Sequence, residues 1–325
     1  MSLLEQINER WTKKTNAQAL ATKWAADLKD RKADATKWAG KFRELSPLRA
    51  YFPVTNATQP TLAFSLRYLG QHVGNVVIRK DRPVVVIHQK TALLNSKYFD
   101  LEENRNFVKG VDLEDPQVSE FIRRIRKIPT TRTGRIQEHR IESLFLDEME
   151  RPTKSKFGET LQGIQPVLFG GCPFQLPVPI SGSKGKPELS KGNTDIVARR
   201  GHGRGVRISI WELKSPGVEA HAIEQAYIYG MSLMRMLRSK DSGHIWYRDI
   251  FGFSGKVPDR LKIECVAAVS LGHDSKREAF EAKCRRFVQN NDLSFNGDSL
   301  EFYVAHYKEC PGLEVDLRSI PKTTA

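Results

Sequence analysis

The sequence predicts an α/β (α+β) fold with a central mixed sheet flanked by helices, preceded by an N-terminal module of helix and β-meander. Three observations predict it. From residue 135 onward, the periodicity gives the order helix, three strands, helix, strand, helix, strand. Residues 1–45 have the spacing of an amphipathic helix, and residues 50–90 have strand composition interrupted by turn residues.

The N-terminal helix places apolar residues at the a and d positions of a heptad repeat. Two tryptophans, in the repeated tetrapeptide Thr-Lys-Trp-Ala, lie two heptads apart and face the same way. This face either packs on its own domain or serves dimerisation or partner binding. Its residues are Ala17, Ala21, Trp24, Leu28, Ala35, Trp38, Phe42 and Leu45.

The meander is predicted at residues 61–68, 72–78 and 83–88, and a helix follows at about 115–127. The helix ends in a basic segment that continues to Arg135. We place the domain boundary there. Residues 1–130 then form a module for recognition, partner binding or dimerisation, and residues 131–325 form the second domain.

The second domain begins with a helix at 135–149, and its prolines make 174–180 an edge strand at most. Two β-rich runs follow, starting at Asp195 and Ile208. The remaining predicted elements are a helix at 219–239, a strand at 260–270, a helix at 275–290 and a strand at 300–307.

The composition limits the classes of partner. Lys and Arg total 52 against 38 Asp and Glu, a net charge of +14, which favours a polyanion such as nucleic acid. No apolar run approaches the roughly 20 residues of a membrane span. The N-terminus also lacks the layout of a signal peptide. We therefore expect a cytoplasmic protein that does not bind membranes.

The four cysteines and eight histidines show no metal-binding spacing. A zinc site or a disulfide framework is therefore not expected. Any bound metal is expected on carboxylates, which favours hard ions such as Mg²⁺ or Mn²⁺.

Two charged residues interrupt the apolar strand that ends in Ile-Trp-Glu-Leu-Lys. Side chains alternate along a strand, so Glu212 and Lys214 share one face. The Gly-rich residues 200–205 suit a hairpin connection. Pairing the two runs would place Asp195 beside Glu212.

This constellation suits phosphodiester hydrolysis. Asp195 and Glu212 are hard oxygen ligands, and the carbonyl of Leu213 lies between the two site-facing side chains. Lys214 could orient or deprotonate water or stabilise the transition state, and Gln225 could hold water or Lys214 in position. The alternative is a structural salt bridge between Glu212 and Lys214.

These residues and the order of elements resemble the PD-(D/E)XK nuclease superfamily, the restriction-endonuclease-like fold, over roughly residues 135–310. The resemblance implies that Asp195 and Glu212 bind metal and that Lys214 directs water. It also implies a role for Gln225 and Tyr229, and for a glutamate of the preceding helix. Glu142 and Glu138 both fit that last position, with Glu142 as a further metal ligand. Thr194 departs from the family's proline.

Four arginines flank the predicted hairpin. We expect them to grip a phosphate backbone close to the metal, although a solvated turn also explains them. They are Arg199, Arg200, Arg204 and Arg207.

The sequence therefore predicts a Mg²⁺-dependent endonuclease, with DNA as the expected substrate and a homodimer or higher oligomer as a further expectation. Family analogy suggests antiviral defence against foreign DNA. The alternatives are a repair or recombination nuclease acting on branched DNA, and a non-catalytic nucleic-acid-binding or assembly protein that keeps the fold.

Overall fold

The computed structural model describes residues 1–12, 17–52, 61–87, 105–127, 137–150, 161, 163–201, 206–215, 219–270, 274–310 and 312–322. The chain divides into two compact units, each built from separate stretches. The first comprises Met1–Ala26, Leu144–Val167 and Gln175–Ala325, and the second comprises Asp27–Ser143 and Leu168–Phe174. These limits differ from the predicted boundary at 130. The role predicted for residues 1–130 stays a prediction.

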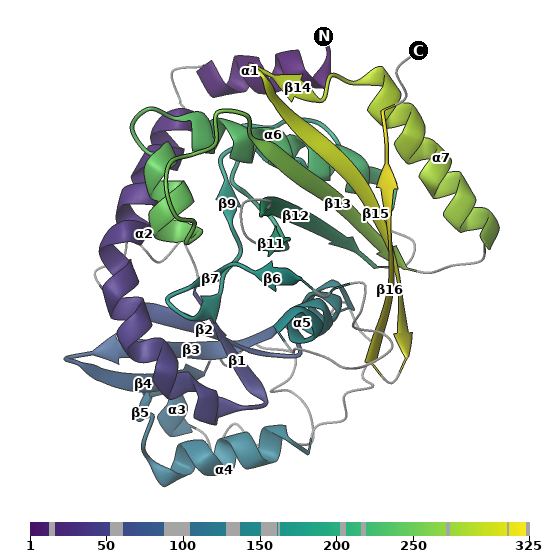
Figure 1. Cartoon of the computed structure of the whole chain (residues 1–325). Coiled ribbons are helices and arrows are strands. Elements are labelled where there is room, and N and C mark those ends of the chain that lie inside the picture. Colours follow the sequence, from purple (N-terminus) through teal and green to yellow (C-terminus); the bar gives the residue numbers. More distant parts are fainter. Residues whose placement is uncertain are drawn as a thin grey trace. The chain divides into compact units, whose positions relative to one another are not determined.

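A curled mixed sheet forms the centre of the first unit, with seven strands among the described residues (Figure 1). Strands β12, β13 and β15 run parallel, and their other neighbours pair antiparallel. The expected mixed sheet flanked by helices is confirmed. The strand order is β14-β15-β13-β12-β11-β6, with β16 also paired to β15. Their bounds are β6 (Ile164–Pro166), β11 (Ile196–Arg200), β12 (Arg207–Lys214), β13 (Lys262–Ser270), β14 (Ser294–Phe295), β15 (Asp298–Cys310) and β16 (Gly312–Ile320).

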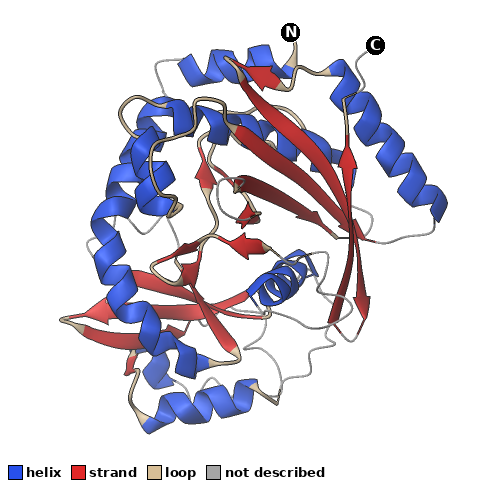
Figure 2. Ribbon diagram, viewed as in Figure 1, coloured by secondary structure: helices blue, strands red, loops and turns tan. Residues whose placement is uncertain are grey.

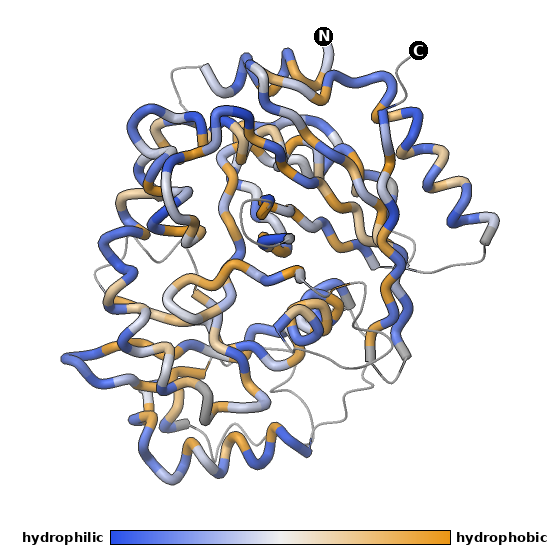
Figure 3. The backbone as a smooth tube through the Cα atoms, in the orientation of Figure 1, coloured by the Kyte–Doolittle hydropathy of each residue, from blue (hydrophilic) through white to orange (hydrophobic). Residues whose placement is uncertain are grey.

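Hydrophobic residues run through the middle of this sheet (Figure 3). Every residue of β13 from Ile263 to Val269 is buried, as expected for a parallel strand covered on both faces. The face of β12 that bears Trp211 packs on Phe145, with ring centroids 5.7 Å apart. Phe145 belongs to α5 (Gln137–Glu150), whose last turns lie in the first unit.

Helix α6 (Ala222–Arg238) is buried on nearly all sides. It packs on β12, β13 and β15, and α1 (Leu3–Thr12) packs on it. Gly230 allows the close approach to β13, because a Cβ there would lie 2.4 Å from the sulfur of Cys265. A helix was predicted at 219–239, and the structure has a short 3-10 turn, η4 (Glu219–His221), followed by α6.

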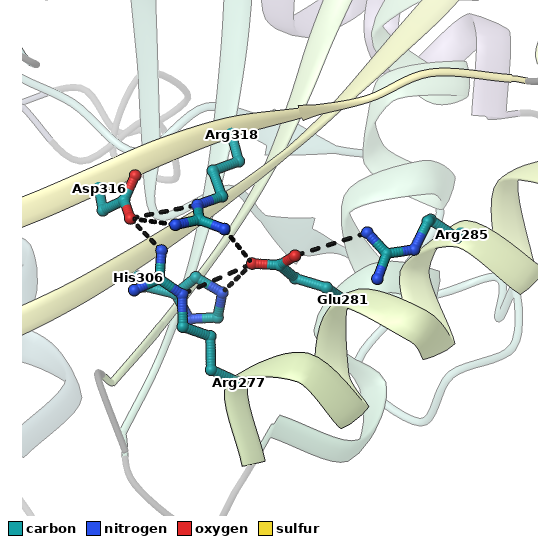
Figure 4. A network of polar contacts seen from close by, with 6 residues as sticks. All are labelled: Arg277, Glu281, Arg285, His306, Asp316 and Arg318. Carbon is teal, nitrogen blue, oxygen red and sulfur yellow. Dashed lines mark hydrogen bonds and ion pairs between the residues drawn. The ribbon is translucent and has the colours of Figure 1, made fainter. Parts of the chain in front are cut away.

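Helix α7 (Asp274–Asn290) is tied to β15 and β16 by a polar network (Figure 4). Glu281 lies at its centre, 3.5 Å from guanidinium nitrogens of Arg277 and Arg318 and 3.2 Å from the imidazole of His306. Asp316 contacts Arg277 and Arg318. Arg285 also lies 3.5 Å from Glu281.

The N-terminal helical prediction is confirmed: α1 is followed by α2 (Ala17–Ala39) and a 3-10 helix, η1 (Gly40–Leu45). All eight apolar heptad positions named above are buried. Burial favours the interpretation that this face packs within the chain. Dimerisation stays a prediction.

The second unit contains the predicted meander (Figure 2). Five strands pair in sequence order. The three expected strands lie in the middle, and β1 and β5 flank them. Asp115 caps α4 by accepting a hydrogen bond from the backbone N–H of Gln117. The bounds are β1 (Leu48–Tyr51), β2 (Ala63–Tyr68), β3 (Gln71–Arg79), β4 (Arg82–Ile87), α3 (Arg105–Lys109), β5 (Val111–Asp112), α4 (Pro116–Ile125), β7 (Leu168–Phe169) and β8 (Cys172–Pro173).

Several features were not expected from the sequence, among them strands β6 and β14 of the central sheet. β16 follows β15 directly, and a π-helix, η5 (Ile245–Ile250), lies between α6 and β13. The segment expected as an edge strand contributes only β9 (Pro177–Val178), paired with β10 (Gly192–Asn193). None of the helices that the structure describes has the length and apolar character of a membrane span.

Candidate carboxylate and lysine site

The β11–β12 hairpin brings the predicted carboxylates together. Ile196 pairs with Trp211 in an antiparallel register, so Asp195 stands next to Glu212 at the end of the ladder. The Oδ2 atom of Asp195 accepts a hydrogen bond of 2.7 Å from the backbone N–H of Leu213. This bond fixes Asp195 against the strand that carries Glu212 and Lys214.

Glu212 and Lys214 lie on the same face of β12, as expected from strand alternation. The Lys214 Nζ atom lies 3.9 Å from Glu212 Oε2. The side chain of Glu212 is 0% exposed and that of Lys214 is 12% exposed. Burying a carboxylate is costly without a cation nearby, so the two positions depend on each other. The hydroxyl of Tyr307 donates to the carbonyl oxygen of Lys214 and holds this end of the strand.

Helix α6 places Gln225 and Tyr229 beside Glu212. The Nε2 of Gln225 donates to the Tyr229 hydroxyl at 3.3 Å. Burial, followed by the nearby negative charge of Glu212, raises the pKa of Tyr229 to about 12. Gln225 therefore contacts Tyr229, whereas its predicted contact with water or Lys214 stays a prediction.

Two small residues that the sequence analysis did not single out complete this corner. Ser181 and the backbone of Gly182 act on the Tyr229 hydroxyl in the direction that lowers its pKa, against the larger effect of burial. A Cβ on Gly192 would lie 2.8 Å from that hydroxyl oxygen, so glycine is required there. Glycines just before Asp195 were visible in the sequence, but only the fold shows what they approach.

The glutamates of α5 have a different setting. Glu142 is buried in the second unit, with Oε1 3.6 Å from Arg67 and Oε2 3.5 Å from His139. Arg67 also lies over the Tyr51 ring. Glu138 is half-buried on the same helix. Their participation in the site, including Glu142 as a metal ligand, stays a prediction.

The hairpin arginines lie at the other end of the ladder. Arg200 pairs with Arg207, five residues before Glu212, or about 16 Å at roughly 3.3 Å per residue. The expectation that they lie close to the metal stays a prediction. Arg200 lies 3.2 Å from Glu264, and Arg207 contacts Glu264 and Glu301.

Arg199 sits at this end as well, with its guanidinium 6.0 Å from the centre of the Phe253 ring. Arg204 lies outside the described residues. The arginines that are described thus contact carboxylates or an aromatic ring. Binding of a phosphate backbone stays a prediction.

The donor set suits a magnesium or manganese ion by its chemistry. Mg²⁺ is commonly held by one or two carboxylates and keeps several waters. Asp195, Glu212 and the Leu213 carbonyl supply such hard oxygens on adjoining strand positions. Within the described part of the chain, no group of three or more His, Cys, Asp or Glu side chains is arranged to hold a metal.

Comparisons with protein-family models, curated proteins and solved structures gave no match to this chain.

Proposed function

We propose that this protein is a Mg²⁺-dependent nuclease of the PD-(D/E)XK kind that hydrolyses phosphodiester bonds, with DNA as its substrate. The observation that carries the proposal is the register of β11 and β12, which places Asp195 next to Glu212 with Lys214 on the same face. The mixed sheet with α6 on that face supports a restriction-endonuclease-like core. The net charge of +14 supports a polyanionic substrate.

In this proposal Asp195, Glu212 and the Leu213 carbonyl hold the ion. A bound divalent ion supplies Lewis-acid polarisation of the phosphate and lowers the pKa of water. The Lys214 ammonium orients the attacking water and offsets negative charge on the phosphate. The hydrogen bond from the Leu213 N–H keeps Asp195 in place. Tyr229, hydrogen-bonded to Gln225, lies near enough to Glu212 to interact with its charge.

A plasmid-nicking assay with Mg²⁺ or Mn²⁺ tests the proposal. We expect the wild type to cut and Asp195→Ala and Lys214→Ala to lose at least about 100-fold in rate, as when a charge-stabilising group is removed from an active site. Lys256→Ala is a matched control, because Lys256 is an exposed lysine paired only with Asp259 among the contacts described. Metal-dependent cutting that survives both site changes would overturn the assignment.

The same assay on linear and branched DNA separates the biological settings. Cutting of linear and branched DNA at equal rates fits defence against foreign DNA. A strong preference for junctions would instead indicate repair or recombination.

A further inference from the structure

A cavity of about 240 Å³ lies at the start of β12 and β13, away from the carboxylate pair. Its walls combine cationic side chains with aromatic rings. Small-molecule sites are usually about 300–1,000 Å³. This cavity is therefore suited to one ring system rather than to a large ligand. Its polar and aromatic lining includes Arg207, Tyr247, Phe253, Arg260 and Lys262.

The aromatic wall is built by the long connection between α6 and β13. Tyr247 lies in the π-helix η5, a rare conformation that is frequent at functional sites. Its ring stacks on Phe253 with centroids 4.7 Å apart and an interplanar angle of 15°. The guanidinium of Arg199 extends this row of planar groups. Nucleobases stack on aromatic rings and on guanidinium planes.

The cationic wall carries more positive charge than its acids neutralise. Arg200, Arg207 and Lys262 face two carboxylates, Glu264 and Glu301. Arg260 is exposed at the cavity and adds a further positive charge. Together with Arg200, which pairs with Glu264 outside the cavity lining, the four cations exceed the two acids by two. That excess suits a phosphate group.

We propose that this cavity binds one unpaired nucleotide, with the base against the row of planar groups and the phosphate on Arg260 and Lys262. The inference rests on the proposed function in taking a nucleic-acid strand as the source of that nucleotide. The cavity lies about 16 Å along β12 from Glu212, or about five nucleotides of a B-form strand at 3.4 Å each. A single-stranded segment held here would anchor the substrate away from the point of cleavage.

Fluorescence anisotropy of a labelled oligothymidylate, measured in EDTA without divalent ions, tests the cavity separately from cleavage. We expect Arg260→Ala and Phe253→Leu each to weaken binding of the single strand about tenfold, since stacking and charge both contribute. Lys256→Ala, which removes an exposed charge from the same connection, should change affinity less than twofold. A duplex of equal length should respond to Arg260→Ala no more than to Lys256→Ala.

Competition with thymidine monophosphate separates a free nucleotide from a strand. If thymidine monophosphate competes with the oligonucleotide in the wild type but not in Arg260→Ala, the cavity binds a nucleotide. If the oligonucleotide binds more tightly than the monophosphate, the nucleotide belongs to a strand. Equal losses in Arg260→Ala and Lys256→Ala, or wild-type affinity in Phe253→Leu, would overturn the inference. Nicking activity in the same preparations is a separate readout. An inactive protein with the expected binding pattern would overturn the nuclease proposal alone.

Discussion

The carboxylate of Glu212 is completely buried. The energetic cost of that burial bears on whether Glu212 has a structural or a chemical role. A buried carboxylate is stabilised only by close partners, and Lys214 at 3.9 Å is the closest cation described. Replacing a buried ion pair with neutral groups is often neutral or stabilising. A buried pair is therefore weak evidence for a role in stability, which is consistent with the chemical role proposed for Glu212.

This leads to a prediction for Glu212→Gln, which keeps the shape of the side chain. We expect the melting temperature in EDTA to fall, because the change removes the Glu212 charge from beside the largely buried Lys214 ammonium, and breaking a buried pair from one side is destabilising. Mg²⁺ should raise the melting temperature of the wild type and not of the variant, because a ligand that binds the folded state stabilises it. Differential scanning calorimetry with and without Mg²⁺ measures both effects. An equal Mg²⁺ response in the two proteins would contradict the assignment of Glu212 as a ligand.

At the level of elements, the tight contact of α6 with β13 depends on Gly230. Alanine favours helices by up to about 1 kcal/mol over glycine, but its Cβ would lie 2.4 Å from Cys265 Sγ. We expect Gly230→Ala to cost about 1–3 kcal/mol in the free energy of unfolding, as overpacking does. Urea denaturation measures it.

Gly40→Ala is the control for this substitution, because a Cβ at Gly40 meets nothing within 4 Å. It should be neutral or slightly stabilising. The double variant Gly230→Ala with Cys265→Ala should recover part of the loss, since the two residues share one contact. A stabilising effect of Gly230→Ala alone would show that α6 has room to move.

The network that holds α7 gives a prediction for pH. Burial and the charge of Arg277 lower the pKa of His306 below its usual 6.5, despite the opposing effect of Glu281. The unfolded chain therefore binds a proton more readily than the folded one. The stability from neutral His306 is present above pH 6.5 and is lost as the pH falls below it.

We expect the melting temperature to decline between about pH 7 and pH 5, and His306→Gln to reduce that decline. The lowered pKa of Asp316 contributes only in stronger acid, because its usual value is 3.8. There the hydrogen bonds from Arg318 and Arg277 outweigh the opposing effect of burial. A steeper decline in the variant would contradict this account of the network.

For the whole molecule, the limits of the two units determine which fragments of the chain can be expected to fold alone. The first unit includes Met1–Ala26, and α1 packs on the buried helix α6. Arg235 of α6 contacts Asn8, and burial lowers the pKa of Arg235 to about 10. Truncation of the chain at the predicted boundary, residue 130, would remove α1 and expose this part of α6 to solvent.

We therefore expect a fragment of residues 131–325 to unfold at much lower urea concentration than the full chain, or to aggregate. Circular dichroism during urea titration compares the two. Adding residues 1–26 as a separate peptide should restore stability in proportion to its concentration. A fragment as stable as the full chain would support the boundary at 130 instead.

The local elements were predictable because their periodicity is strong. The meander, α4, α6 and the β11–β12 hairpin follow from apolar spacing and turn residues, and the pairing of Asp195 with Glu212 follows from the hairpin. β16 was missed although Leu313, Val315 and Leu317 alternate with charged residues, because the last strand was predicted to end at residue 307 and no strand was assigned after it. The contact of Tyr229 with Ser181 was also missed, since it joins segments far apart in the chain. Sequence spacing carries no information about such tertiary contacts.

The β11–β12 hairpin separates its carboxylate end from its arginine end by five residue pairs. Effects of substitutions usually add when the sites lie more than about 7–10 Å apart and share no partners. Changes at Arg200 or Arg207 can therefore accumulate without disturbing Asp195 and Glu212. Such independence lets selection alter what one end of the hairpin recognises while the other end keeps the same reaction, which makes the hairpin a suitable unit for evolutionary diversification.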